Sequence, residues 1–245
     1  MEEYKGIGRM WHLYKLGGVT PAIASILGSQ KAQHMAYIRH ANRHMRNSSM
    51  LDVPLRELEA AVFDLETTGF HPGSGDEIIS FGAVIVRGEK AIEESGHFYS
   101  LVNPSRAIPK HIQELTGITD DMVKEAPPLL EALRQFMAFI GKRLLIAHGS
   151  NHDRKFLDAA LWRTSRVNLN HRVLDTMMVA KWLEPGREDY GLDGLLSTNG
   201  IQLRRRHHAL DDALMTGELW QIYLKQMLER QVITLGDLYA YLSRR

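Results

Sequence analysis

Between residues 60 and 228 the hydrophobic pattern changes from strand-like to helix-like, and this order limits the folds open to the chain. Three apolar or alternating segments come first, at 60–64, 78–86 and 97–102, with glycine-containing turns between them. Strands joined by short connections tend to pair with their neighbours in the chain. We therefore predict that these three segments form an antiparallel meander.

After the meander, short apolar strands alternate with amphipathic helices. The pattern predicts strands at 143–147 and 173–174, and helices at 127–140, 153–162 and 209–228. Strands that alternate with helices are typical of parallel additions to a sheet. The whole pattern therefore predicts an α/β fold, a mixed five-stranded sheet flanked by helices.

The α/β pattern divides the chain into three parts. We predict a helical N-terminal extension at 1–57, the α/β domain at 58–228, and a C-terminal tail at 229–245 with a short helix from Leu235 to Leu242. Thr20-Pro21 is typical of a helix start, because proline fits the first helical position. The apolar residues of the extension near one helical face are Ile23, Ile26, Leu27, Ile38, Ala41 and Met45.

The net charge of +1 conceals a basic N-terminal extension. Residues 1–50 carry a charge of +5, and the remaining 195 residues carry −4. Charge asymmetry of this kind indicates an acidic partner. The basic residues in this segment are Lys5, Arg9, Lys15, Lys31, Arg39, Arg43 and Arg46.

Composition excludes several classes of protein. Without cysteine, the chain has no disulfide framework, no cysteine-based zinc site and no cysteine nucleophile, so a metal must bind oxygen or imidazole ligands. The longest nearly apolar stretch, 78–86, has nine residues, whereas a membrane-spanning helix needs about 20. The N-terminal MEEYKGIG has no apolar signal core. We expect a cytoplasmic protein that has no membrane partner.

A pair of carboxylates ends the first predicted strand. Strand side chains alternate, so Asp64 and Glu66 point to one face while Leu65 points to the other. Adjacent carboxylates repel unless a proton or a cation lies between them, and Mg²⁺ or Mn²⁺ suits oxygen ligands. A lone Asp-x-Glu is also typical of a solvated strand end, so the pair needs support from elsewhere in the chain.

Two further carboxylates stand at predicted helix starts. Asp153 follows the strand at 143–147, and taken alone it is better explained as an N-cap. Asp212 lies one turn into the last long helix, whose entry carries His207 and His208, and acids there also suit the helix macrodipole. Because α/β sheets present functional groups at strand ends and helix starts, the four acids together predict one site.

The order and spacing of these residues resemble the DEDDh 3′-to-5′ exonucleases, the family of the proofreading epsilon subunit of bacterial replicative DNA polymerases and of RNase T. Asp64 and Glu66 match the first motif of that family, Asp153 the second, and His207 with Asp212 the third. In the family a His precedes this Asp by five positions, so His207 rather than His208 takes the catalytic place. Further matches between Ala60 and Leu224 are Phe63 to Gly69, Asn103-Pro104, Ile108-Pro109, Leu115 to Ile118 and Leu174 to Thr176.

The resemblance implies an RNase H-like fold and a metal-dependent exonuclease that hydrolyses phosphodiester bonds from the 3′ end of single-stranded or frayed DNA, releasing nucleoside 5′-monophosphates. It implies His207 as general base and two divalent cations, Mg²⁺ or Mn²⁺, on Asp64, Glu66, Asp153 and Asp212. The substrate contacts that we expect are Thr67, Thr68, Phe70 and His148, with Phe70 stacking or wedging a base. The expected partners are nucleic acid with a free 3′ end, DNA rather than RNA, and a DNA polymerase or a repair protein.

Two departures from the family lie in its second motif. The family has His-Asn and then an aromatic residue directly before the Asp, whereas this chain has His148-Gly149 and His152. Two alternatives stay open: an RNA 3′-end-trimming exonuclease of the same family, and a nucleic-acid-binding module that keeps the fold with weakened catalysis. Arg204-Arg205-Arg206 is either a contact to the phosphate backbone or a solvated loop. The basic extension either adds to the nucleic-acid surface, binds a partner or docks on its own domain.

Overall fold

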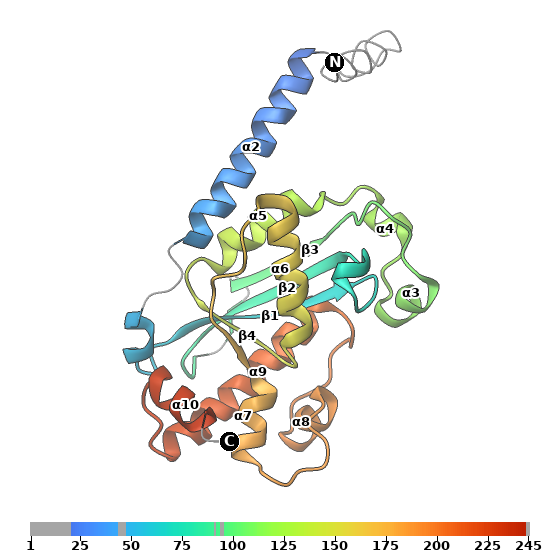
Figure 1. The fold of residues 1–245 in the computed structure, drawn as a ribbon. Helices are drawn as coiled ribbons and strands as arrows, with labels where there is room; N and C mark the ends of the chain where they lie inside the picture. The colour runs from blue at the N-terminus through green and yellow to red at the C-terminus, as the bar shows by residue number, and fades with distance from the viewer. Residues whose placement is uncertain (1–20, 44–47, 91, 94–95, 244–245) are drawn as a thin grey trace.

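The computed structural model describes residues 21–43, 48–90, 92–93 and 96–243. These residues form a sheet with helices on both faces, as Figure 1 shows. The five strands found among them run in the order β3-β2-β1-β4-β5. Their bounds are β1 Glu59–Thr67, β2 Ile78–Arg87, β3 His97–Leu101, β4 Leu144–Ala147 and β5 Val173–Asp175.

Strand β1 lies at the centre of the sheet. It is antiparallel to β2, which is antiparallel to β3, and it is parallel to β4, which is parallel to β5. The predicted meander and the mixed five-stranded α/β sheet are therefore confirmed. Strand β1 continues to Thr67, so both acids of the first motif lie within it, as the alternation of Asp64 and Glu66 required.

Helices cover the two faces of the sheet separately. The helices α2, α5 and α6 lie on one face, and α7, α8, α9 and α10 lie on the other. The helix bounds are α2 Pro21–Arg43, α3 Lys110–Thr116, α4 Asp120–Lys124, α5 Leu129–Ile140, α6 Asn151–Ser165, α7 Thr176–Leu183, α8 Leu192–Thr198, α9 Ala209–Glu229 and α10 Leu235–Leu242. Two 3₁₀ turns, η1 Ser48–Asp52 and η2 Pro72–Ser74, complete the described elements.

Alternation along β1 decides which face its acids occupy. Phe63 packs on the α5 and α6 side, with its ring 5.9 Å from that of Phe136. Val62 packs on the opposite side, among residues of α7 to α10. Full burial of such an apolar side chain contributes about 1.5–3 kcal/mol, which fixes the register of the strand. Asp64 and Glu66 follow Val62 in the alternation and therefore face α9.

Helix α9 approaches the sheet closely because one residue of β2 has no side chain. Gly82 pairs with Asp64 across the two strands. A Cβ atom at Gly82 would lie 2.1 Å from the carbonyl carbon of Ala209 and 2.2 Å from the amide nitrogen of Leu210. Glycine thus lets the N-terminus of α9 rest on the strand beside Asp64.

Four short helices, α3, α4, α7 and α8, were not predicted. They have seven, five, eight and seven residues, too few to show a clear helical period. Their sequence signals are local, as in Thr119 and Asp175, whose side chains accept hydrogen bonds from the amides of Met122 and Met177 at the helix starts. The sequence therefore did not reveal two walls of the candidate site, which are formed by α3 and α8.

The described part of the N-terminal extension docks on the domain through the second half of α2. Ile38 is fully buried in the α5 and α6 side of the core. The side chain of Asn42 accepts a hydrogen bond from the amide of Asn170 at 3.0 Å, and Arg39 Nε donates to the carbonyl of Ser165 at 2.9 Å. Docking on its own domain, one of the readings of the extension, thus holds for this half of the helix.

The C-terminal segment also joins the core. Leu235 and Leu238 of α10 are fully buried in the cluster that contains α7 and α9. The helix starts at the predicted residue, and its first turn is closed by reciprocal hydrogen bonds between Thr234 and Asp237. The three-part division of the chain stays a prediction.

Several expectations for the N-terminus lie outside the described residues. They concern Thr20, Met45, Lys5, Arg9, Lys15 and Arg46, together with the side chains of Ile23, Ile26 and Leu27. Among the described helices, none is both long and apolar enough to cross a membrane.

Candidate active site

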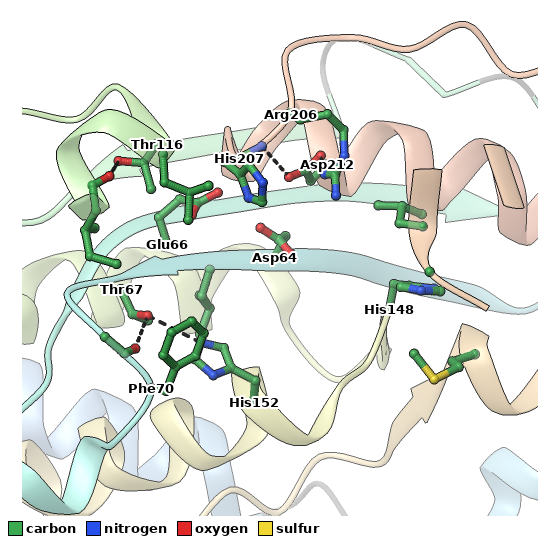
Figure 2. Close-up of a pocket in the computed structure, with 17 residues that line it drawn as sticks. Asp64, Glu66, Thr67, Phe70, Thr116, His148, His152, Arg206, His207 and Asp212 are labelled. Atoms are coloured by element: carbon green, nitrogen blue, oxygen red, sulfur yellow. Dashed lines mark hydrogen bonds and ion pairs between the residues drawn. The ribbon is translucent and has the colours of Figure 1, made fainter. Parts of the chain in front are cut away.

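A pocket of about 360 Å³ opens where β1 ends beneath the N-terminus of α9. Asp64 and Glu66 extend from β1 into it, and His207 and Asp212 extend toward them from the opposite wall (Figure 2). Ligand atoms of Glu66, His207 and Asp212 all lie within 4.8 Å of one another. Among the described residues, the structure therefore places three of the five predicted catalytic residues close enough to share one ion.

An unusual backbone conformation directs the ring of His207 into the pocket. Its φ angle is 55°, in the left-handed region, which costs about 1–3 kcal/mol for a residue other than glycine. The amide of His207 donates a hydrogen bond to Oδ2 of Asp212 at 2.9 Å. One carboxylate thus belongs to the cluster and also holds the backbone of the candidate base.

Asp153 lies at the back of the same site. It belongs to the first turn of α6, where Ser150 occupies the N-cap position, so the reading of Asp153 as an N-cap is wrong. The amide of Leu65 donates to its Oδ1 at 3.2 Å, and the residue is only 4% exposed. It is not among the residues that line the pocket. Asp153 therefore faces the cluster from behind β1.

Burial raises the pKa of every acid in the cluster, and repulsion between the acids adds to the shift at Asp64 and Glu66. For Asp64 the pKa lies well above its usual range, because burial disfavours the charged form and Asp153, Glu66 and Asp212 add negative charge nearby. Burial likewise raises the pKa of Glu66, with further contributions from Asp212 and Asp153. Burial also raises the pKa of Asp153 and of Asp212, and the Arg206 guanidinium opposes the shift at Asp212. Such a cluster requires protons or cations.

We expect Asp64→Asn to raise the melting temperature of the metal-free protein at pH 8. The folded protein holds protons on these acids more strongly than the unfolded chain does, so its stability falls as pH rises above about 4 and through the raised pKa values. Removing one charge relieves this penalty, and each kcal/mol gained raises the melting temperature by about 2–4 °C. Thermal unfolding in EDTA at pH 8 and pH 5 measures the effect.

The gain should shrink at pH 5, because the pKa of Glu66 is about 8 and that of Asp153 about 7, so both acids are protonated there and repel Asp64 less. Saturating Mn²⁺ should reverse the order of the two proteins, because the variant would lack a carboxylate that we predict to bind the ion. The matched control is Asp52→Asn, on the exposed turn η1, which should change little at either pH. A lower melting temperature for Asp64→Asn in EDTA at pH 8 would contradict the repulsion argument.

The second histidine of the pair has a different place. His208 is the N-cap residue of α9, with its Nδ1 3.4 Å from the amide of Asp211. Its ring stacks on Tyr99 of β3 with 4.7 Å between ring centroids. The two adjacent histidines are thus divided between the pocket and the helix cap.

Only some of the expected substrate contacts in the segment after β1 line the pocket. Phe70 is 68% exposed and lines the pocket together with Thr67. The hydroxyl of Thr68 instead donates to Asp76 at 3.1 Å and accepts from the amide of Glu77 at 3.0 Å, and Thr68 does not line the pocket. Of the three candidates in this segment, Thr67 and Phe70 therefore reach the pocket and Thr68 does not.

In the altered second motif, His152 stands where the family has an aromatic residue, and its ring packs against other aromatic rings. Its centroid lies 5.7 Å from that of Phe70 and 4.7 Å from that of Phe156. The hydroxyl of Thr67 donates to the carbonyl of Gly69 at 2.7 Å, so the 3.3 Å contact between Thr67 and Nε2 of His152 requires the imidazole to donate. Histidine thus packs as an aromatic residue and adds a hydrogen bond.

The other departure, at Gly149, is accommodated by Asp175. Gly149 has a φ of 66°, and its amide donates to Oδ1 of Asp175 at 3.0 Å. The amide of Ser150 donates to Oδ2 of Asp175 at 2.8 Å. The neighbouring His148 lines the pocket, and its Nδ1 lies 2.9 Å from the hydroxyl of Thr176. Burial lowers the pKa of His148, so its ring is neutral near pH 7.

Sequence reasoning missed the role of Arg206 in the site. Its guanidinium pairs with Asp212 through Nη1 and with Asp193 of α8 through Nε. Arg204 pairs with Glu218 at 2.9 Å, and Arg205 donates to the carbonyl of Thr116 at 3.1 Å. Arg204 and Arg205 are exposed on the loop before α9, so the solvated-loop reading fits these two residues, although each has a partner. Arg206 departs from that reading, because it is half-buried and pairs with Asp212 inside the site. The signal was the position of Arg206 directly before His207.

Comparison with known proteins identifies the family. The profile of the exonuclease family, described as Exonuclease, matches residues 61–220. This chain belongs to the exonuclease family. The predicted membership in the DEDDh 3′-to-5′ exonucleases, and with it the predicted class of enzyme, is confirmed. The family implies a dependence on divalent metal ions.

Two curated relatives and one solved structure illustrate the range of the family. The PolC-type DNA polymerase III of Oceanobacillus iheyensis is 33% identical over 181 residues, which is 74% of this chain and 12% of that protein. A DNA polymerase III subunit epsilon-like protein of Rhodobacter capsulatus is 36% identical over 192 residues, 77% of this chain and 27% of that protein. The chain thus spans a small part of the length of these relatives.

The solved structure of exonuclease X in complex with 5′ overhanging duplex DNA has the same fold. Its TM-score is 0.55 at 23% identity, and the match covers 68% of this chain and 92% of that one. The similarity confirms the RNase H-like fold that the resemblance implied.

Proposed function

We propose that this chain is a 3′-to-5′ exonuclease that hydrolyses the terminal phosphodiester bond of single-stranded or frayed DNA and releases nucleoside 5′-monophosphates. One observation carries the proposal. Glu66 on β1 and His207 with Asp212 at the start of α9 bring their ligand atoms within 4.8 Å of one another, in a pocket that a nucleotide can enter. The family match covers all three residues.

The acids of the cluster fit two divalent cations, Mg²⁺ or Mn²⁺. Hard oxygen ligands predominate, and the mutual repulsion of the acids favours a multivalent positive charge. Asp64, Glu66 and Asp212 would hold one ion, and Asp64 and Asp153 would hold the second, with Oδ1 of Asp153 already accepting from the amide of Leu65. When bound, such ions activate water and stabilise the negative charge of the reacting phosphoryl group.

His207 would act as the general base. Imidazole is the side chain that most often takes a proton in catalysis. The hydrogen bond from its amide to Asp212 holds the backbone, so the ring is positioned before substrate arrives. In this role His207 takes the proton of the attacking water while the acids hold the ions.

The remaining walls of the pocket suit the terminal nucleotide. Phe70 and Leu115 are large exposed apolar side chains that line the pocket from the loop after β1 and from α3, and Thr67 and His148 line it as polar groups. A volume of about 360 Å³ falls in the range of small-ligand sites, which favours one unpaired nucleotide over a paired end. A base would stack on Phe70.

Two comparisons support DNA as the substrate and a polymerase as a partner. The relatives from Oceanobacillus iheyensis and Rhodobacter capsulatus are named as DNA polymerase III proteins, and the exonuclease X structure contains DNA. RNA trimming and binding with weakened catalysis are the alternatives that the experiment must separate.

We expect the full chain to shorten a 5′-labelled single-stranded DNA from its 3′ end in Mn²⁺ or Mg²⁺, and EDTA to stop the reaction. Chromatography of the products should show nucleoside 5′-monophosphates. RNA of the same sequence and a DNA with a 3′-terminal phosphorothioate linkage serve as comparisons. Faster loss of RNA than of DNA would favour the RNA-trimming enzyme, and no metal-dependent cleavage of either would favour the binding module.

A further inference from the structure

The guanidinium of Arg206 places a positive charge beside the acids of the cluster, where a bound cation would also place one. Of the 17 described residues that line the pocket, Arg206 is the one with a permanent positive charge. Its guanidinium lies beside Asp212, whose side chain is 6% exposed (Figure 2). It also pairs with Asp193, whose side chain is 65% exposed. One arm of the guanidinium thus lies inside the site and the other at the surface.

Both carboxylate oxygens of Asp212 are already engaged. Oδ2 accepts from the amide of His207 at 2.9 Å, and Oδ1 accepts from Nη1 of Arg206. The guanidinium at Oδ1 carries a full positive charge, which repels a divalent ion at the same carboxylate, whereas the amide at Oδ2 is neutral. The amide belongs to a fixed backbone, whereas the arginine side chain can rotate, so Oδ1 is the oxygen that becomes free.

The charge of Arg206 acts on the rest of the cluster as well. It favours the ionised forms of Asp64, Glu66 and Asp212, and so lowers the pKa of each acid against the effect of burial. A divalent ion would do the same. Arginine and ion therefore compete for the same negative charge.

We propose that Arg206 is an exchangeable counter-ion, which holds Asp212 until a divalent ion takes Oδ1 and then binds the phosphate backbone of the nucleic acid. The proposal rests on the proposed function. The pair with Asp193 is mostly exposed, and such pairs contribute little, so it does not prevent the exchange. A guanidinium binds phosphate through two parallel hydrogen bonds.

Neighbouring arginines provide matched controls. Arg204 pairs with Glu218 on the outer side of α9, and that guanidinium does not line the pocket. Arg204→Gln therefore removes one positive charge from the same loop without touching Asp212. Arg206→Lys keeps the charge at the site but replaces the planar fork by a single ammonium group.

Isothermal titration of the full chain with Mn²⁺ tests the first half of the exchange. We expect Arg206→Gln to bind Mn²⁺ about tenfold more tightly than the unchanged protein, because the competing cation is gone. Arg204→Gln should bind it as the unchanged protein does, and Arg206→Lys should fall between the two. Circular dichroism confirms that each variant is folded.

Fluorescence anisotropy with a single-stranded DNA that has phosphorothioate linkages at its 3′ end tests the second half, in Ca²⁺. We expect Arg206→Gln to weaken binding of this probe about tenfold, and Arg206→Lys to weaken it less. Equal or weaker Mn²⁺ binding by Arg206→Gln overturns the exchange, and unchanged DNA binding overturns the phosphate contact. Suppose that the unchanged protein degrades DNA with Mn²⁺, but that Arg206→Gln binds Mn²⁺ and DNA as the unchanged protein does. The inference about Arg206 then fails and the proposed function stands. If the unchanged protein binds no Mn²⁺, both fail.

Discussion

Replacing Asp212 with alanine should reduce metal-dependent DNA degradation about a thousandfold. Asp212 contributes a carboxylate to the cluster with Glu66 and accepts from the amide of His207 at 2.9 Å. Its loss would therefore remove a proposed metal ligand and release the proposed base. A metal ion contributes several kcal/mol to the transition state of such reactions, and each ~1.4 kcal/mol corresponds to a factor of ten. The rate of nucleotide release in Mn²⁺ measures the loss.

Two adjacent residues allow matched controls for this experiment. Asp211 differs from Asp212 by one position and contacts His208 at the helix cap, so Asp211→Ala should keep the rate within a few-fold.

His207→Ala should lower the rate by about 10²–10⁴, the usual contribution of a general base. His208→Ala should lower stability by about 0.5–2 kcal/mol through the lost cap and leave the rate nearly unchanged. Comparable activity in Asp212→Ala and Asp211→Ala would contradict the assignment of the ligands.

Replacing Gly82 with alanine should reduce the rate at least about a hundredfold, although Gly82 does not line the pocket. The added Cβ would lie 2.1 Å from the Ala209 carbonyl carbon, so the start of α9 must move away from β2. That movement carries His207 and Asp212 away from Asp64, the cross-strand partner of Gly82. Displacements of about 1 Å can cost a hundredfold in rate.

Gly73→Ala is the matched control for Gly82→Ala. Gly73 lies in the turn η2, and apart from its chain neighbours no atom lies within 4 Å of the place that an alanine Cβ would take there. This change should therefore alter neither the rate nor the melting temperature. Circular dichroism should show that Gly82→Ala keeps its helices and strands. A Gly82→Ala protein with full activity would show that the contact between α9 and β2 does not position the site.

The sheet could be predicted from the sequence, because the alternation of side chains along a short strand shows which face of the sheet each residue occupies. Val62 and Phe63 alternate between two faces, and this period of two also places Asp64 and Glu66 on one side. The spacing of His207 and Asp212 identified the third motif before the structure showed their contact. These features depend on neighbours in the chain, so a single sequence displays them.

The contacts that sequence could not reveal join distant segments. No pattern indicates that Gly82 touches Ala209, that Asp175 holds the amides of Gly149 and Ser150, or that Arg206 pairs with Asp193. These contacts depend on how distant segments pack together, and the hydrophobic period of one segment does not predict that packing. The short helices α3 and α8 were missed for a related reason, since they are stabilised by the surfaces on which they lie.

The central position of β1 also has a consequence for folding. The antiparallel partner β2 follows β1 closely in the chain, whereas β4 and α9 follow much later, so the acids of the site converge only when nearly the whole domain has been assembled. Contacts between segments so distant in sequence form slowly, because long loops must close first. Incomplete chains and partly folded states therefore lack the complete cluster, because His207 and Asp212 lie late in the chain. Nuclease activity should consequently report complete folding more stringently than helix or strand content does.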